Sequence, residues 1–337
     1  MKIGLPLKIG IAVVVFFCLL LGGLLIWTPV RVRYYVGKLN SADDKKRVEG
    51  VNGLIACGPA GKDALARNLA GGEPAADFLI THWAKPNDVS EQEIFDRRPL
   101  HLAAEKGYPK IAELFIAKGA EVNATDCREI PLDWTPLHWA VYSNQKAVAE
   151  LLISKGAEVN AKGKIGESPL HIAATRNYYS IAGFLIAKGA DVNVENIYVM
   201  TPLHFAANGR YEIARLLIEK GAKVSPRDKD GWTPLHHAAG YCDKNIAEML
   251  INKGALVNSK TNYGLTPLHS AAIHGRNSVV ELLIEKGSGI NTKDHSDRTP
   301  LDCAIEREKN EIAAFLRKHG GKTGKELMEQ ENRETGK

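Results

Sequence analysis

The sequence lacks the patterns that mark most enzymes and metal proteins. Its five cysteines are scattered and form no CxxC pair, so neither a disulfide framework nor a zinc site is expected. None of the motifs GxSxG, HExxH or GxGxxG occurs, which removes the usual sequence support for catalysis. The net charge of +5 is mild and spread along the chain, unlike the clustered basic face of a nucleic-acid-binding domain. We therefore expect no enzyme, no cofactor, no metal and no nucleic-acid partner.

Charge is missing altogether from residues 9–27, IGIAVVVFFCLLLGGLLIW. A helix of this run would be about 28 Å long, close to the hydrocarbon thickness of a bilayer. Basic residues flank the run on both sides, and Trp27 falls at the expected interface. We interpret 9–27 as a single-pass transmembrane helix, followed by a juxtamembrane linker at 28–40.

Two questions about this segment stay open. A cleaved signal peptide, leaving a secreted or periplasmic protein, is the alternative, although Thr28-Pro29-Val30-Arg31 does not form a small-x-small cleavage site. The basic flanks are nearly balanced, so they hardly decide orientation. A short basic N-terminal tail mildly favours an inside N-terminus, with the rest of the chain on the non-cytoplasmic side.

One unit recurs along most of the remaining chain, and residues 233–258 are its clearest copy. Thr233 can cap a first helix, Pro234 suits the first helical position, and Gly254 can end a second helix. The cap position recurs at Arg98, Thr135, Ser168, Thr201, Thr233, Thr266 and Thr299, with steps of 37, 33, 33, 32, 33 and 33 residues. The terminating glycine recurs at Gly119, Gly156, Gly189, Gly221, Gly254, Gly287 and Gly320. Helices this short need neighbours to bury their apolar faces, so the pattern predicts a stacked array.

The period, the helix pair and the TPLH words together resemble the ankyrin repeat family. The resemblance implies that residues 88–321 form an all-α solenoid of seven repeats with short β-hairpin loops. It also implies a monomer that binds a protein partner of unknown identity.

Six histidines recur once per repeat: His101, His138, His171, His204, His236 and His269. Stacked helices lie about 8–10 Å apart and zinc holds nitrogens at about 2.0–2.1 Å, so these rings cannot converge on one ion. The resemblance implies instead that they link adjacent repeats by hydrogen bonds. It also implies that the side chains of Asn123, Asn160, Asn193, Asn258 and Asn291 brace the hairpin backbone.

The segments beside the array have their own character. Apolar spacing predicts helices near 43–56, 60–69 and 75–83, and the stretch 41–70 looks weakly like a HEAT-type helical pair. We interpret 41–87 as a helical cap that covers the open face of the first repeat. The polar residues 322–337 are expected to form a mobile tail.

The resemblance places partner binding on the concave face made by hairpin tips and first helices. The residue types that dominate binding hot spots occur there in most copies. The candidates are Phe95, Arg97, Trp134, Tyr142, Arg176, Tyr198, Met200, Trp232, Tyr241, Tyr263 and His274. The alternative for some rings is packing on neighbouring hairpins, which would stiffen the array. The function expected is a membrane-anchored scaffold; an enzyme accessory with a composite site is a second possibility.

Overall fold

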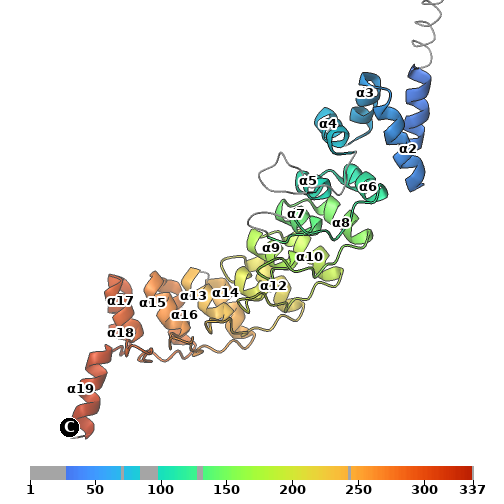
Figure 1. Cartoon of the computed structure of the whole chain (residues 1–337). Coiled ribbons are helices and arrows are strands. Elements are labelled where there is room, and N and C mark those ends of the chain that lie inside the picture. Colours follow the sequence, from blue (N-terminus) through green and yellow to red (C-terminus); the bar gives the residue numbers. More distant parts are fainter. Residues whose placement is uncertain (1–27, 70–71, 84–97, 127–131, 242–243, 336–337) are drawn as a thin grey trace, which may run out of the picture. The chain divides into compact units, whose positions relative to one another are not determined.

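The computed structural model describes residues 28–69, 72–83, 98–126, 132–241 and 244–335 (Figure 1). All regular structure in these ranges is helical, as expected, but no residue in them belongs to a β-strand. The chain divides into two compact units, Met1–Pro131 with Thr135–Ala157 and Leu132–Trp134 with Glu158–Lys337. Each unit is described separately below.

The first unit holds the expected cap and two helix pairs. Residues 28–39, expected as a linker, form a helix. The helices that follow are α2 (Asp44–Ile55), α3 (Pro59–Asn68), α4 (Gly72–His82), α5 (Pro99–Lys106), α6 (Pro109–Ala117), α7 (Pro136–Tyr142) and α8 (Lys146–Ser154). The three helices expected between residues 43 and 83 are confirmed as α2, α3 and α4.

The cap helices pack on the first helix pair through aromatic rings. Phe115 of α6 is fully buried, with ring centroids 6.1 Å from Phe78 and 6.2 Å from Trp83. The Trp83 indole N–H also donates to the Asn52 side-chain oxygen of α2 at 2.8 Å. Aromatic burial of this size dominates small cores, so it joins the three helices to the start of the array.

The second unit continues the pairs. Its helices are α9 (Pro169–Arg176), α10 (Tyr179–Ala187), α11 (Pro202–Ala206), α12 (Tyr211–Glu219), α13 (Pro234–Tyr241), α14 (Lys244–Asn252), α15 (Pro267–His274), α16 (Asn277–Glu285), α17 (Pro300–Glu306), α18 (Asn310–Lys318) and α19 (Gly324–Thr335). First helices contact first helices, as in α11 with α13, and second helices contact second helices, as in α12 with α14 (Figure 1). The predicted stacking of neighbouring copies is therefore confirmed within this unit.

The first helices α7, α9, α11 and α15 begin with a capping box in which histidine takes the third position. In α15, the backbone N–H of Thr266 donates to His269 Nδ1 at 3.1 Å, while the threonine hydroxyl accepts from the histidine backbone N–H. Because a backbone N–H can only donate, Nδ1 must be unprotonated and Nε2 must carry the proton. The same box starts the helices at Thr135, Ser168 and Thr201.

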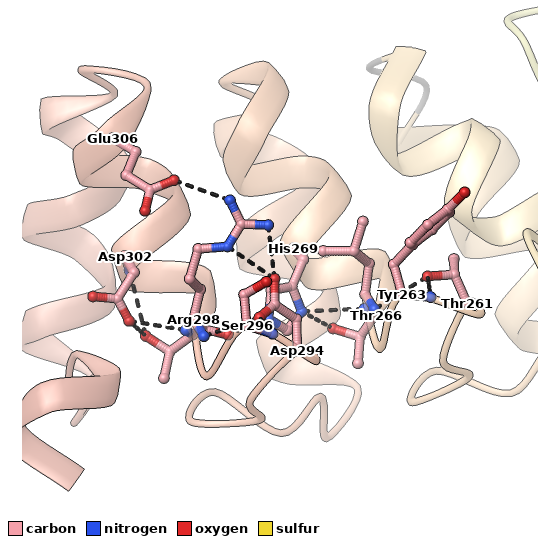
Figure 2. Close-up of polar contacts among 11 residues, drawn as sticks. Thr261, Tyr263, Thr266, His269, Asp294, Ser296, Arg298, Asp302 and Glu306 are labelled. Carbon is pink, nitrogen blue, oxygen red and sulfur yellow. Dashed lines mark hydrogen bonds and ion pairs between the residues drawn. The ribbon is translucent and has the colours of Figure 1, made fainter. Parts of the chain in front are cut away.

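The proton on Nε2 links each repeat to the next one. His269 Nε2 lies 3.1 Å from the Arg298 carbonyl in the following loop (Figure 2). The equivalent pairs are His171 with Met200, His204 with Trp232 and His236 with Leu265, at 2.9, 3.3 and 3.1 Å. The predicted histidine links are confirmed for these four residues, in each of which the ring joins a helix start to the neighbouring loop.

The asparagines that recur along the array bond to the end of the second helix in the next repeat. Asn258 Nδ2 donates to the Gly287 carbonyl at 3.2 Å, and its Oδ1 accepts from the Gly289 N–H at 2.9 Å. Asn123, Asn160, Asn193 and Asn291 bond to the terminating glycine of the next repeat in the same way. The prediction that these side chains brace the hairpin backbone is therefore wrong. The amide instead bonds the backbone that follows the second helix of the next repeat, and so satisfies that helix terminus.

In the last repeat, the hydrogen bond that takes the place of the histidine link runs in the opposite direction. Asp302 stands in the histidine position, and its Oδ2 accepts from the Thr299 N–H at 2.9 Å and from the Gly324 N–H at 2.7 Å. A carboxylate cannot donate, so it receives an N–H where histidine would have offered one. The segment 322–337, expected as a tail, carries helix α19 from this contact onward; its mobility stays a prediction.

Within the described residues, no helix combines the length and apolar character needed to cross a membrane. The predicted transmembrane segment 9–27 lies outside those residues.

Burial makes the histidine links sensitive to acid. It lowers the pKa of His171, His204 and His236 from the usual 6.5 to about 4, and it also lowers the pKa of His269. Below pH 6.5 these histidines therefore bind protons in the unfolded chain but not in the folded chain. The free energy of unfolding should fall as the pH drops from 6.5 towards 4, by about 1.4 kcal/mol per pH unit for each histidine.

We predict that the urea midpoint of the full chain, followed by circular dichroism, falls steadily from pH 7 to pH 5. His204→Gln should be less stable than the wild type at pH 7. Its unfolding should take up about one proton fewer, so its stability should fall less steeply as the pH drops. A midpoint that does not change between pH 7 and pH 5 would contradict the role of the neutral rings.

Candidate functional site

The loops between repeats in the second unit are closed by their own polar groups. In the loop 196–200, the Asn196 N–H donates to the Met200 carbonyl at 3.1 Å. Asn196 Oδ1 accepts from the backbone N–H groups of Tyr198 and Met200 at 2.9 and 3.0 Å. Asp228, Thr261 and Asp294 hold the next three loops with the same pair of side-chain contacts. The expected hairpins are thus tight turns, with no room for strand pairing within one loop.

Neighbouring loops are also joined to one another. The Ile197 N–H donates to the Ile165 carbonyl at 3.0 Å, and the Lys229 N–H donates to the Tyr198 carbonyl at 2.9 Å. The same bond joins Lys164 to Leu132, Asn262 to Asp230 and His295 to Tyr263. The loop tips therefore lie side by side in a regular row.

Apolar side chains stand exposed along this row. Ile165, Ile197, Tyr198 and Tyr263 are 40%, 54%, 48% and 57% exposed. In the last two loops, the Tyr263 ring extends away from the polar network that holds the turns (Figure 2). The backbone bonds are satisfied below the tips, so these exposed side chains are not needed to hold the turns.

A groove opens beside the row, between the loops and the first helices α13 and α15. It encloses about 560 Å³. Met200, Trp232, Tyr241 and His274 line it, together with His237 and Arg276. The Trp232 ring lies 5.6 Å from His236 and 5.9 Å from His237, measured between ring centroids. The groove is therefore walled largely by rings, which suits the burial of a side chain.

Two acidic residues, Asp228 and Asp230, line the groove together with the rings. Burial alone would raise the pKa of Asp228, but His237 and the backbone N–H groups of Trp232 and Asp230 outweigh it and hold the pKa below its usual value. Asp228 Oδ2 lies 3.9 Å from His237 Nε2, beyond a direct hydrogen bond. Asp228 thus stays ionised and holds the loop, facing the groove with one oxygen.

The structure brings four of the predicted binding residues, Met200, Trp232, Tyr241 and His274, into one groove. Tyr198 and Tyr263 lie on the adjoining row, and Arg176 is exposed at the end of α9. Phe95 and Arg97 lie outside the described residues.

Two predicted residues are positioned differently. Trp134 is only 7% exposed, and its indole N–H donates to Glu167 Oε1 at 2.6 Å. For this ring the alternative interpretation fits better, since it packs inside the second unit. Tyr142, in the first unit, is half-buried with its ring 5.7 Å from Trp139.

Val199 was not among the residues predicted from the sequence, yet its backbone conformation is unusual. Its φ is +59°, in the left-handed region that a β-branched residue rarely adopts. The same loop position holds Gly166, Gly231 and Gly264, with φ of +74°, +80° and +80°, and Asp297 with φ of +58°. Aligning the loop tips would have revealed a valine where glycine is usual. Among the described residues, no group of three or more His, Cys, Asp or Glu side chains is placed to hold a metal ion.

Comparison with known families agrees with this architecture. A family model described as ankyrin repeats in three copies matches residues 64–163, 100–196, 161–228, 224–294 and 257–326. Together these matches cover more than half of the chain. A search of curated proteins found no match.

We predict that Val199→Gly stabilises the second unit. A left-handed conformation costs a residue with a side chain about 1–2 kcal/mol, whereas the flexibility of glycine costs about 0.5–1 kcal/mol. The expected net gain is about 1 kcal/mol, seen as a melting temperature about 2–4 °C higher by circular dichroism. Asp297→Gly, the matched control, should gain less because aspartate tolerates this conformation better. A lower melting temperature for Val199→Gly would mean that the valine packs favourably enough to offset its strain.

Proposed function

Because the chain belongs to the ankyrin repeat family, we propose that it is a scaffold that binds a protein partner through the loop row and groove of its second unit. Ankyrin repeats act in protein–protein interaction, and the family is typically not enzymatic. The observation that carries the proposal is the row of exposed apolar tips beside a ring-lined groove. Contiguous exposed apolar side chains of this kind mark interaction surfaces, whereas isolated ones are ordinary.

The surface is preorganised for binding. The loops 196–200, 228–232, 261–265 and 294–298 are each fixed by two contacts from the side chain of their first residue and by one bond to the preceding loop. A rigid surface loses little conformational entropy when a partner binds, which favours affinity. Tyrosine and tryptophan add contact area with few rotatable bonds.

We propose no reaction for the groove. One of the three histidines that line the groove, His236, has Nδ1 bonded to the Thr233 N–H and Nε2 bonded to the Leu265 carbonyl. A ring with both nitrogens engaged is not available as a general base. This favours a binding role.

We also propose that residues 9–27 tether the scaffold to a membrane, with the repeats on the non-cytoplasmic side. Support comes from the uncharged run of 19 residues and its basic flanks. A tether would keep the binding surface near membrane partners and raise their effective concentration without new contacts.

The binding surface can be tested with a photo-crosslinking residue. We predict that p-benzoylphenylalanine at Tyr198 captures a partner in cells, because this side chain stands on the row. The same residue at Tyr179, which is 46% exposed on the second helix α10, is the matched control and should not capture it. Equal capture from both positions, or none from Tyr198, would argue against the loop row as the contact surface.

The tether can be tested by extraction. We predict that the full chain stays in the membrane pellet at alkaline pH, and that deletion of residues 1–27 releases it. A full chain that is soluble under these conditions would contradict the tether. A mature N-terminus located after residue 27 would instead indicate the cleaved signal peptide.

A further inference from the structure

We propose that loop 196–200 and the basic residues around it select a partner segment that is acidic and carries an aliphatic or aromatic side chain. This inference rests on the proposed function and adds the chemistry of the partner. Three independent observations lead to it: the composition of one loop, its strain and the charge of the row.

Loop 196–200 differs in composition from the loops beside it. It presents Ile197, Tyr198, Val199 and Met200 in succession, whereas the next loop presents Lys229, Asp230 and Gly231. Ile197 and Tyr198 are about half exposed, and Met200 continues into the groove. Four successive apolar residues at a turn, two of them exposed and two half-buried, are unusual unless something covers them.

The strain at Val199 points the same way. The turn is enforced by bonds on both sides: the Val199 N–H donates to the Asn196 carbonyl at 2.9 Å, and Ile197 and Tyr198 bond to the neighbouring loops. Glycine adopts this conformation without steric strain, as at Gly166, Gly231 and Gly264. The half-buried Val199 side chain is therefore not required by the turn itself. Strain retained against stability is typical of a residue kept for function.

The row around this loop is positively charged. At the loop tips 162–167, 195–200, 227–232 and 260–265, five basic side chains are exposed, against two exposed acidic ones, Glu195 and Asp230. The same tips also hold the less exposed Glu167 and Asp228. The basic residues are Lys162, Lys164, Arg227, Lys229 and Lys260.

Backbone carbonyls, which carry no net charge, hold several of these cations in place. Lys162 Nζ donates to the Glu195 carbonyl at 3.1 Å, and Arg227 donates to the Lys260 carbonyl at 2.6 Å. In the part of the chain that the structure describes, none of the five forms an ion pair with a carboxylate. Their charge is thus left for a complementary partner.

An acidic peptide segment fits these features better than an anionic lipid surface does. Both would satisfy the cations, and both would accept the apolar tips. Only a peptide can also place a side chain in the groove of about 560 Å³ that begins at Met200.

The test is a selection of displayed random peptides, about twelve residues long, on the immobilised full chain in detergent. We expect the enriched peptides to carry net negative charge and at least one aliphatic or aromatic residue. Their affinity, measured by fluorescence anisotropy, should fall as salt is raised, because exposed charges are screened.

Three variants show whether the selected peptides use the proposed contacts. Val199→Gly should weaken binding about tenfold although it raises the melting temperature, and the double variant Lys164→Glu with Lys229→Glu should weaken it at least as much. Asp297→Gly, the control at the same turn position on the last loop, should bind as the wild type does.

Neutral or basic enriched peptides, no enrichment, or peptides insensitive to Val199→Gly would overturn the inference. So would variant-sensitive binding to phosphatidylserine vesicles without any peptide preference, since the surface would then recognise lipid. If the crosslink from Tyr198 captures a partner through a segment that is not acidic, the inference fails while the proposed function stands. If Tyr198 captures nothing, the proposed function itself fails.

Discussion

The second unit depends on one neutral imidazole per repeat. Its Nδ1 accepts the N–H of the capping residue, and its Nε2 donates to a carbonyl in the following loop, as in His236 between Thr233 and Leu265. Both bonds require the uncharged ring, which burial enforces by keeping its pKa low. The start of a helix, the end of the next loop and the spacing between repeats are therefore set by a single side chain. Only a ring with a donor at one end and an acceptor at the other can do this.

This link separates the side chains that build the array from those that face outward. Backbone groups in the loops are satisfied by the histidine, by the leading polar residue and by the neighbouring loop, so the turns do not depend on tip side chains such as Tyr198 and Tyr263. The tips can vary freely while the backbone beneath them stays regular. Loop 196–200 and loop 228–232 have the same backbone bonds and quite different surfaces. A binding surface can thus change its chemistry without changing its shape.

Much of this could be predicted from the sequence, because the signals repeat. The capping residue, the proline after it and the terminating glycine fall in register, and together they locate both helices of each pair. The histidine links followed from the same register. The burial of Trp134 could not be predicted, because a tryptophan beside a loop gives the same sequence pattern whether it faces solvent or is buried. Here its indole N–H bonds to Glu167. The target of Asn258 depends on where the next repeat ends in space. The strain at Val199 is a backbone angle, which a periodic pattern does not report.

Where the chain departs from its own pattern, the position of the departure indicates its meaning. Asp302 replaces histidine in the last repeat and takes its bond from the Gly324 N–H, so no loop carbonyl is needed beyond it. That change ends the array. Val199 lies in the middle, where the links on both sides are intact and stacking continues unchanged. The bonds that stack the repeats do not require this departure, and the proposed partner surface supplies a reason for it.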